Sequence, residues 1–586
     1  MPLRGERVLH ETIITNWLID FFSFLRMSPI KRPRQEKRLR CGTAQKRLKM
    51  TQEFDLLIKN GHLIDGSGNP YYRADIGIAA GQIICINRDI SPTGVKRVIH
   101  ADGLTVSPGF FDTHTHDDLY VLINPTWDEK ILQGITTIII GNCGISMVPM
   151  SEDHRTGIKD MLAGLGGEQI PKEDWEIQSL DDFLRRLDAV RPGINVLPLA
   201  GHHAVRIAVL GSANRAPTDF ELKRMKELVA GAMEDGAFGM STGLIYAPGS
   251  YAETDEIIEL SKVVSRFNGI YVSHIRSESD LEIPAIAEAI KIGEEADLPI
   301  HISHHKVVGR NNWGKSVETL KMMEEARARG LEVTCDQYPY HAASTFLAAV
   351  LPPSILEGGP EVYSQQLKDP KIREEVIAEI EKGGECQWEN MIKGAGLENI
   401  VIAMSNHRDY VGKSIAEIAE MEKKSPYDVI FDLVVEEKRG AFAIFFMMDD
   451  DDIQRIMRCP FIMVGTDAVP PIGVSRVHPR VAGTFPRILG RYVREKGVLS
   501  LEEAIRKMTS LPAQTFRVKR KGLLMEGFDA DIVIFNPKTI LDKATYEDPL
   551  QKPEGVTYVL VNGEIAVENG EVTGATSGKV LRHKKS

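Results

Sequence analysis

Cysteine is scarce in this sequence, with six residues among 586. They stand far apart, at positions 41, 85, 143, 335, 386 and 459. No two of them form a CxxC pair, and nothing resembles the dense cysteine framework of a small secreted domain. The spacing argues against a disulfide scaffold and favours a reducing cytoplasmic location over secretion.

Excess positive charge and long apolar runs are also lacking. The formal net charge is −11 and the sequence pI is about 5.9, so we expect neither nucleic acid nor an anionic membrane as a partner. The apolar stretch "IITNWLIDFFSFL" is too short to span a bilayer, and Asp20 interrupts it. The basic run after Arg26 does not fit a signal peptide. We interpret residues 1–49 as a disordered extension, or as an upstream start with Met50 as the true initiator; a basic arm or anchor is the alternative.

Short strands and turns occupy both ends of the chain. From Phe54 onward the N-terminal end alternates apolar segments with turn residues, and the C-terminal end repeats this form. Asn-Gly and Ala-Gly pairs predict turns at residues 60–61, 80–81, 562–563 and 569–570. Because a few strands pack poorly alone, we predict one small β-sandwich built from residues 50–107 and 518–586.

The middle of the chain, residues 108–517, alternates apolar strands with helical patterns. Eight strands are predicted, ending in "TVSPGFFDTHTH", "ITTIIIGNCG", "INVLPLAGHH", "AFGMSTGL", "GIYVSHIR", "LPIHISHHK", "LEVTCDQYPY" and "PFIMVGTDA". Eight such strands, each followed by a crossover, predict an α/β fold with a TIM-type (β/α)8 barrel. Residues 342–448 are too many for one connection between strands seven and eight, so we predict an inserted subdomain, a candidate lid. The run Asp449–Asp452 predicts the acidic first turn of the next helix.

Residues that can bind a metal stand where these strands end, which is where barrel enzymes carry their active sites. The first strand ends in His114 and His116, whose side chains share a face because they are two residues apart. The second, fifth and sixth strands end in Cys143, His274 and His304. A single cysteine is most often an inert buried thiol, and only the joint placement carries weight. Three His and Cys ligands with open positions suit catalytic zinc.

Asp467 ends the eighth strand, at the same predicted rim. A carboxylate there can take a proton from water and later return it to a leaving group. A helix N-cap or a loop aspartate is the alternative interpretation. His301 lies inside the sixth strand and is expected to pack or to support a ligand. The remaining histidines of this region stay unassigned: His203, His305 and His341.

These residues resemble the amidohydrolase superfamily, through "GFFDTHTH", the histidines of strands five and six, and the strand-eight aspartate. Within it the chain is similar to the D-aminoacylase (N-acyl-D-amino-acid deacylase) branch from Phe54 to about Leu581. The stretches that carry this resemblance include "GITTIIIGNCGIS", "GMSTGLIYAPGSYA", "HISHHK", "DQYPY" and "HPRVAGTFPRILG". The single His-x-His pair is widely shared, whereas Gly-Asn-Cys-Gly together with Ser-His-His-Lys is far more specific.

The resemblance implies a role for each matching residue. Cys143, His274 and His304 match the ligands of a tight zinc site, and His114 and His116 match a pair that can form a second, weaker site. Asp467 matches the general acid and base. Three residues match contacts to the substrate carboxylate: Lys306, Tyr338 and Arg480. Many hydrolytic relatives use a carboxylated lysine from strand four, but "GMSTGL" offers none, and a thiolate from strand two plausibly replaces it.

The resemblance therefore implies zinc-dependent hydrolysis of N-acyl-D-amino acids to a carboxylate and a D-amino acid. Hydrolysis of a cyclic amide, as in dihydroorotases and hydantoinases, is the alternative reaction, and the missing strand-four lysine argues against it. A non-catalytic scaffold is the alternative of another class, although such a protein is expected to have lost ligands. The sequence leaves open the acyl group, the preferred side chain and the oligomeric state.

Overall fold

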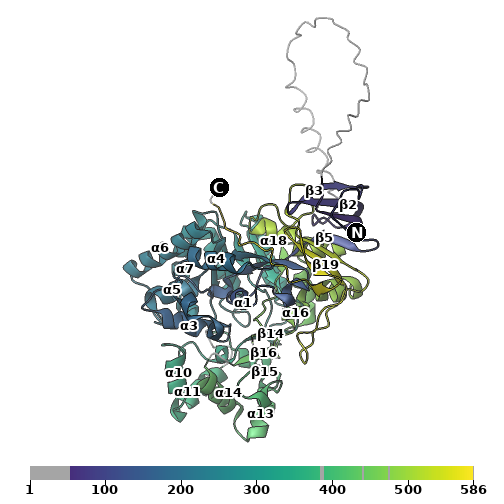
Figure 1. Ribbon diagram of the computed structural model, residues 1–586. Helices are drawn as coiled ribbons and strands as arrows, with labels where there is room; N and C mark the ends of the chain where they lie inside the picture. The colour runs from purple at the N-terminus through teal and green to yellow at the C-terminus, as the bar shows by residue number, and fades with distance from the viewer. Residues whose placement is uncertain (1–52, 383–387, 439–440, 473–475, 585–586) are drawn as a thin grey trace, which may run out of the picture. The chain divides into compact units, whose positions relative to one another are not determined.

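The computed structural model describes residues 53–382, 388–438, 441–472 and 476–584 (Figure 1). The predicted extension, residues 1–49, lies outside the described residues, as do Cys41 and Cys386. The remaining cysteines are free thiols: Cys85, Cys143, Cys335 and Cys459. Within the described ranges, no helix is both long enough and apolar enough to cross a membrane.

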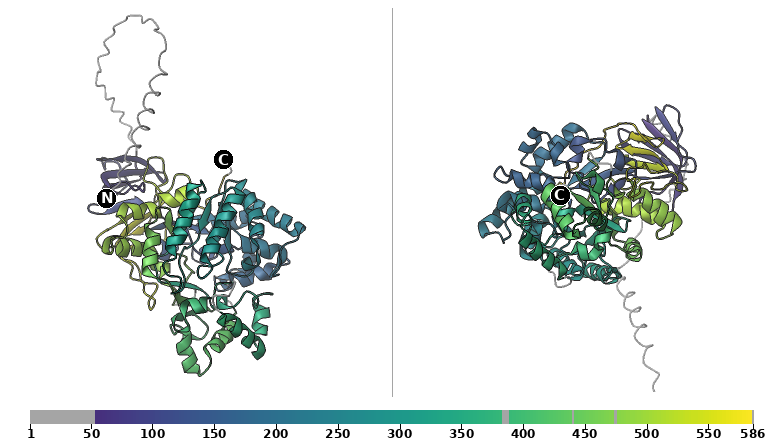
Figure 2. Two further views of the ribbon diagram at one scale, coloured as in Figure 1. Left: turned by 180° about the vertical axis from the view of Figure 1, so that it is seen from behind. Right: turned by 90° about the horizontal axis from the view of Figure 1, so that it is seen from below.

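One mixed sheet joins the two ends of the chain. Its nine strands are β1 (Leu56–Leu63), β2 (Tyr72–Ala79), β3 (Gln82–Asn87), β4 (Arg97–His100), β5 (Thr105–Pro108), β18 (Ile532–Phe535), β19 (Val556–Val561), β20 (Glu564–Glu568) and β21 (Glu571–Val572). The junction is the antiparallel pairing of β5 with β18, so the purple and yellow strands lie side by side in Figures 1 and 2. Alternate residues of these strands, such as Ile76, Ile532 and Ile534, form a common apolar cluster.

Three of the four predicted turns are present, and one is wrong. Residues 80–81 connect β2 to β3, 562–563 connect β19 to β20, and 569–570 connect β20 to β21. At Asn60-Gly61 the chain does not reverse, because β1 continues through it as a bulge, with Asn60 at φ 61°. The Asn60 N–H donates to Asp75 Oδ1 at 2.8 Å, and an added Cβ on Gly61 would lie 2.5 Å from Val106. Glycine is required here by close packing of a strand, not by a hairpin.

All eight strands predicted for the middle of the chain are present, and each pairs in parallel with its neighbours. They are β6 (Phe110–Asp112), β7 (Ile135–Ile140), β8 (Asn195–Pro198) with β9 (Ala200–Gly201), β10 (Gly239–Gly243), β11 (Ile270–His274), β12 (Ile300–Ile302), β13 (Val333–Gln337) and β17 (Ile462–Val464). They fall into two sheets, β6-β7-β8 and β17-β13-β12-β11-β10-β9. Only Leu199 separates β8 from β9, and a parallel bridge between Thr115 and Ala468 links the ends of β6 and β17.

Helices follow the parallel strands along the chain, as in α6 (Asp219–Asp235), α7 (Thr254–Ser265), α8 (Glu282–Ala296) and α9 (Ser316–Ala328). The sequence signals the start of α6 clearly. Thr218 caps its N-terminus, and Glu221 completes a capping box by accepting from the Thr218 N–H. Each of these helices buries apolar residues against the strands, and α7 and α8 also bury one glutamate each, Glu256 and Glu282.

Residues 342–448 form a lobe that leaves and re-enters the parallel strands through paired strands. β14 (Ala342–Phe346) pairs antiparallel with β16 (Phe442–Phe446), which also pairs with β15 (Ile400–Met404). The helices of this lobe are α10 (Pro360–Gln366), α11 (Pro370–Glu381), α12 (Met391–Ala395), α13 (Ile415–Glu422) and α14 (Pro426–Glu437), at the bottom of Figure 1. After it, Asp449 caps α15 (Asp450–Arg458), whose first turn is acidic, as predicted.

Candidate metal centre and active site

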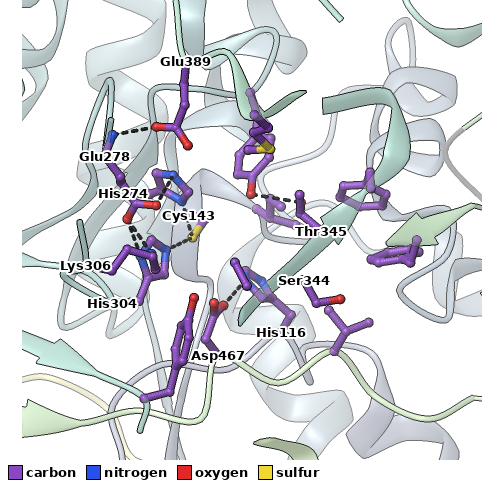
Figure 3. A pocket seen from close by; sticks show the side chains of 18 of the residues that line it. His116, Cys143, His274, Glu278, His304, Lys306, Ser344, Thr345, Glu389 and Asp467 are labelled. Atoms are coloured by element: carbon purple, nitrogen blue, oxygen red, sulfur yellow. Dashed lines mark hydrogen bonds and ion pairs between the residues drawn. The ribbon is translucent and has the colours of Figure 1, made fainter. Parts of the chain in front are cut away.

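The ends of the parallel strands meet at a pocket with a cavity volume of about 40 Å³ (Figure 3). His116, Cys143, His274, His304 and Asp467 line it, so residues from five predicted strand ends come together. The lobe of residues 342–448 supplies another wall: Ala343, Ser344, Thr345, Phe346, Glu389, Met391, Phe442 and Met447. The pocket therefore lies between the strand ends and the inserted lobe.

Cys143 lies at the centre of the histidine cluster. Its Sγ is 3.2 Å from His114 Nε2, 3.6 Å from His274 Nδ1 and 3.5 Å from His304 Nε2. A thiol carries one hydrogen and cannot satisfy three ring nitrogens, whereas a cation among them would satisfy all four atoms. Burial raises the pKa of the Cys143 thiol well above its ordinary value, so the thiolate needs a bound cation to form.

His274 and His304 are both placed to act as ligands. Burial, followed by the proximity of His304, lowers the pKa of His274 well below its ordinary value. The other ring nitrogen of His304, Nδ1, is 2.9 Å from Glu278 Oε1, which also accepts from Lys306 Nζ at 2.5 Å. A carboxylate behind a histidine fixes its tautomer and leaves Nε2 free to coordinate.

His116 and Asp467 face each other on the opposite side of Cys143. Asp467 Oδ1 lies 3.3 Å from His116 Nε2 and 3.6 Å from His114 Nε2, while its Oδ2 accepts from Arg480 Nη1 at 2.7 Å. Burial alone would raise the pKa of Asp467, but the Arg480 guanidinium and the neighbouring histidines outweigh it and hold the pKa well below its ordinary value. Asp467 is therefore an ionised carboxylate with one anchored oxygen.

Three of these residues adopt left-handed backbone conformations that non-glycine residues rarely take. Cys143 has φ 51°, His304 has φ 35° and Asp467 has φ 49°. Each follows the end of a parallel strand, where the chain turns sharply and aims the side chain into the pocket. Backbone strain of this kind, roughly 1–3 kcal/mol per residue, concentrates at functional sites.

Two buried networks hold the strand ends in place. Asp336 accepts from the His304 N–H at 2.5 Å and from Thr113 Oγ1 at 2.6 Å, and it lies 2.9 Å from His301 Nε2. His301 thus supports the site from behind, one of the two roles expected for it. Lys130 donates to Asp112 Oδ2 and to Thr466 Oγ1, both at 2.7 Å, which ties the first strand end to the eighth.

The three residues expected to hold a substrate carboxylate form one group. Lys306 Nζ lies 5.4 Å and the Arg480 guanidinium 4.7 Å from the centre of the Tyr338 ring. Lys306 and Tyr338 line the pocket, whereas Arg480 lies behind it and donates to Asp467 and to the Ser344 carbonyl at 3.1 Å. Tyr338 Oη and Arg480 Nε are buried with no hydrogen-bond partner among the described residues.

Sequence reasoning missed three carboxylates of this site: Glu278, Asp336 and Glu389. Asp336 is the first residue of "DQYPY", a stretch already noticed, and Glu278 lies four residues after His274, just beyond the end of the fifth strand. No sequence pattern marks Glu389. The unassigned histidines have ordinary partners: His203 with the Gly243 carbonyl, His305 with Thr319 and His341 with Asp450.

The side chains fit a transition metal. Three groups, each with ligand atoms within 4.8 Å of one another, are His114-Cys143-His304, His114-His116-Asp467 and His274-Glu278-His304. His114 Nδ1, His116 Nδ1 and His274 Nε2 are buried without a hydrogen-bond partner among the described residues, although His274 Nε2 lies 3.8 Å from Glu278 Oε2. One thiol with several imidazoles matches the preference of zinc. Such a set beside an ionised aspartate, at the ends of parallel strands, defines the site of a metal-dependent hydrolase.

Comparison with known proteins identifies the family. The sequence model of the amidohydrolase family matches residues 97–567 of this chain. D-aminoacylase of Alcaligenes xylosoxydans xylosoxydans is 37% identical over 531 residues, which cover 91% of this chain and 98% of that protein. The chain belongs to the amidohydrolase family and, within it, to the N-acyl-D-amino-acid deacylases. D-hydantoinase of Ralstonia pickettii, which represents the alternative reaction, is only 23% identical.

Solved structures agree with this assignment. One solved D-aminoacylase structure matches with a TM-score of 0.76 at 35% identity. That structure concerns the functional role of the enzyme's binuclear metal center, with one-metal activation and second-metal attenuation. The match covers 90% of this chain and 100% of that one. N-acyl-D-glutamate deacylase from Bordetella bronchiseptica, complexed with zinc and a phosphonate inhibitor that mimics the tetrahedral intermediate, matches with a TM-score of 0.76 at 33% identity and covers 91% and 100% of the two chains.

Proposed function

We propose that this protein hydrolyses the amide bond of N-acyl-D-amino acids, with zinc as its cofactor. The observation that carries the proposal is the placement of Asp467, held from behind by Arg480, against a cluster of one thiol and four imidazoles at the wall of the pocket. The relatives named for this reaction span nearly the whole described chain, which supports the same chemistry here.

Cys143, His274 and His304 would hold the tight zinc ion, and His114 and His116 a second, weaker one. The Sγ of Cys143 lies between the two sets, 3.2 Å from His114 and 3.5 Å from His304. When bound, zinc supplies a Lewis acid that polarises the scissile carbonyl, stabilises its developing negative charge and lowers the pKa of water.

Asp467 is the group that moves the proton. Its Oδ1 faces His114 and His116, and its Oδ2 is held by Arg480, so the carboxylate has one free face directed into the pocket. Asp467 takes a proton from the attacking water and then delivers it to the amine nitrogen as the carbon–nitrogen bond breaks. One water is consumed, and the products are a carboxylate and a D-amino acid.

Tyr338, Arg480 and Lys306 would orient the substrate by its carboxylate. Tyr338 Oη and Arg480 Nε are buried donors that lack a hydrogen-bond partner among the described residues, and a carboxylate that reached them would satisfy both. Lys306 adds a positive charge at the same end of the pocket, although the Lys306 ammonium group also pairs with Glu278. This arrangement supports an anionic substrate end beside Asp467.

The pairings also support the finer architecture expected from the sequence. We infer that the two parallel sheets form one closed (β/α)8 barrel over residues 108–517, with residues 342–448 inserted. Residues 50–107 and 518–586 would form the β-sandwich, because β1 pairs with β4 along its first half and with β5 along its second. The free thiols support a reducing location, and we propose the cytoplasm.

The function is tested with zinc-loaded protein and matched pairs of N-acetyl-D- and N-acetyl-L-amino acids, with release of the free amine as the readout. We expect hydrolysis of the D compounds, and its loss in Asp467→Asn with zinc retained. A hydantoin and dihydroorotate serve as alternative substrates. Turnover of these rings without turnover of any N-acetyl-D-amino acid would overturn the proposal.

A further inference from the structure

Glu389 is a buried carboxyl of the inserted lobe that no catalytic role uses. It lines the pocket and is only 4% exposed. Its Oε2 accepts from the Glu278 N–H at 2.5 Å, while its Oε1 has no hydrogen-bond partner among the described residues. Figure 3 shows the Glu389 carboxyl extending from the lobe, with the oxygen that is not bonded to Glu278 directed toward the cavity. A buried polar atom that faces empty space is normally satisfied by something that enters it.

The surroundings of Glu389 keep its carboxyl neutral. Burial, followed by the charge of Glu278, raises the pKa of Glu389 to about 8. The unpartnered Oε1 of Glu389 can accept from the N–H2 group of an amide, whereas a carboxylate in the same place would bring another negative charge next to Glu278 and Glu389.

The position of Glu389 points to one part of the substrate. Lys306 and Glu389 flank the same residue, since Glu278 accepts from Lys306 Nζ and donates its N–H to Glu389. The side chain of an amino acid branches from the carbon that carries its carboxylate, so it lies nearer to Lys306 than the acyl group does. The lobe also lines the same pocket with apolar side chains: Phe346, Met391, Phe442 and Met447.

We propose that Glu389 selects the side chain of the substrate, favouring an apolar stem that ends in an uncharged hydrogen-bonding group, as in N-acyl-D-glutamine, over an anionic end. This inference rests on the proposed function, because it assumes that the substrate carboxylate faces Lys306. Met391 and Phe442 would contact the stem, and the free Oε1 of Glu389 would bond the terminal amide.

The test compares kcat/KM for three substrates of similar length: N-acetyl-D-glutamine, N-acetyl-D-glutamate and N-acetyl-D-methionine. In wild-type protein we expect glutamine to exceed glutamate by about 100-fold or more, because a desolvated site tuned to one hydrogen-bonding pattern rejects a mismatched isostere strongly. Glu389→Leu should lower the glutamine-to-methionine ratio by about 10-fold or more, while Glu389→Gln, which keeps both hydrogen-bonding functions, should restore it. Ratios within one variant cancel any general loss of activity.

Glu375→Gln is the matched control, since Glu375 is an exposed residue of α11 in the same lobe. Zinc content is measured for every variant. Equal rates on glutamine and glutamate in wild-type protein would overturn the inference without any variant, and so would an unchanged glutamine-to-methionine ratio in Glu389→Leu. If any N-acetyl-D-amino acid is turned over, these results reject the role of Glu389 alone. If none is, the proposed function fails and the inference fails with it.

Discussion

Replacement of Glu278 by glutamine tests whether the carboxylate behind His304 controls metal affinity. Glu278 Oε1 lies 2.9 Å from His304 Nδ1 and 2.5 Å from Lys306 Nζ, and its side chain is 5% exposed. Glutamine keeps the shape but removes the charge that fixes the His304 tautomer. Loss of such a supporting partner typically weakens metal binding by about 10- to 100-fold, or about 1.4–2.7 kcal/mol.

The same change should lower the stability of the metal-free protein. Lys306 would be left as a buried cation without its partner, and breaking a buried pair in this way costs about 3–5 kcal/mol. The effect depends on pH with a defined sign. Because the folded-state pKa of Glu278 is depressed, its stabilising contribution is complete above the ordinary value of 4.5 and is lost as the pH falls through the lower folded value. The difference between wild type and variant should therefore shrink in acid.

Two measurements check this prediction: the zinc dissociation constant by competition with a chromophoric chelator, and urea unfolding of the metal-free protein. Glu288→Gln is the matched control. Glu288 pairs with Arg276 at a distance of 2.8 Å, and it contacts none of the metal ligands named above. It should lose some stability and keep wild-type zinc affinity. A folded Glu278→Gln protein that binds zinc within twofold of wild type would refute the reasoning.

Three further substitutions separate metal binding from proton transfer. Cys143→Ala should lose both zinc and activity, measured by metal analysis and turnover; lost activity with zinc retained would instead indicate a nucleophilic cysteine. Asp467→Asn should retain zinc and lower kcat by about 10²- to 10⁴-fold, the usual contribution of a general acid and base. Gly243→Ala should weaken zinc binding, because an added Cβ would lie 2.3 Å from the Cys143 carbonyl oxygen. Gly231→Ala in α6, where a Cβ meets nothing within 4 Å, should leave zinc affinity unchanged.

The strands and the strand-end residues could be predicted because they follow from local rules. A near-continuous apolar run such as Ile135–Ile140 is the mark of a strand buried on both faces, and β7 has these bounds. The parallel strands of a barrel end at one rim, so a predicted barrel brings the residues at their C-terminal ends together. Cys143, His274 and His304 could therefore be grouped from their positions, without knowledge of any distance.

The supporting carboxylates could not be found in this way, because their roles depend on tertiary contacts. Glu389 reaches the pocket only because the lobe folds back over the strand ends, 111 residues along the chain from its partner Glu278. The pairing of Arg480 with Asp467 likewise depends on how α16 (Arg480–Arg487) packs. The turn predicted at Asn60-Gly61 failed for a related reason, since neighbouring strands on both sides of β1 override the local preference for reversal.

The absence of a strand-four lysine has a structural reason in Gly243. β10 ends there, and the space beside its Cα is filled by the Cys143 backbone, so no side chain can start from this position without displacing the turn. Ser241 fastens the same turn by bonding to the Gly141 carbonyl and by accepting from the Gly144 N–H at 2.9 Å. The end of the fourth strand thus packs against the turn that carries the Cys143 thiol and supplies no metal ligand of its own. Glycine at the end of strand four and cysteine at the end of strand two therefore act as one unit, and a lysine could replace the thiolate only if both positions changed together.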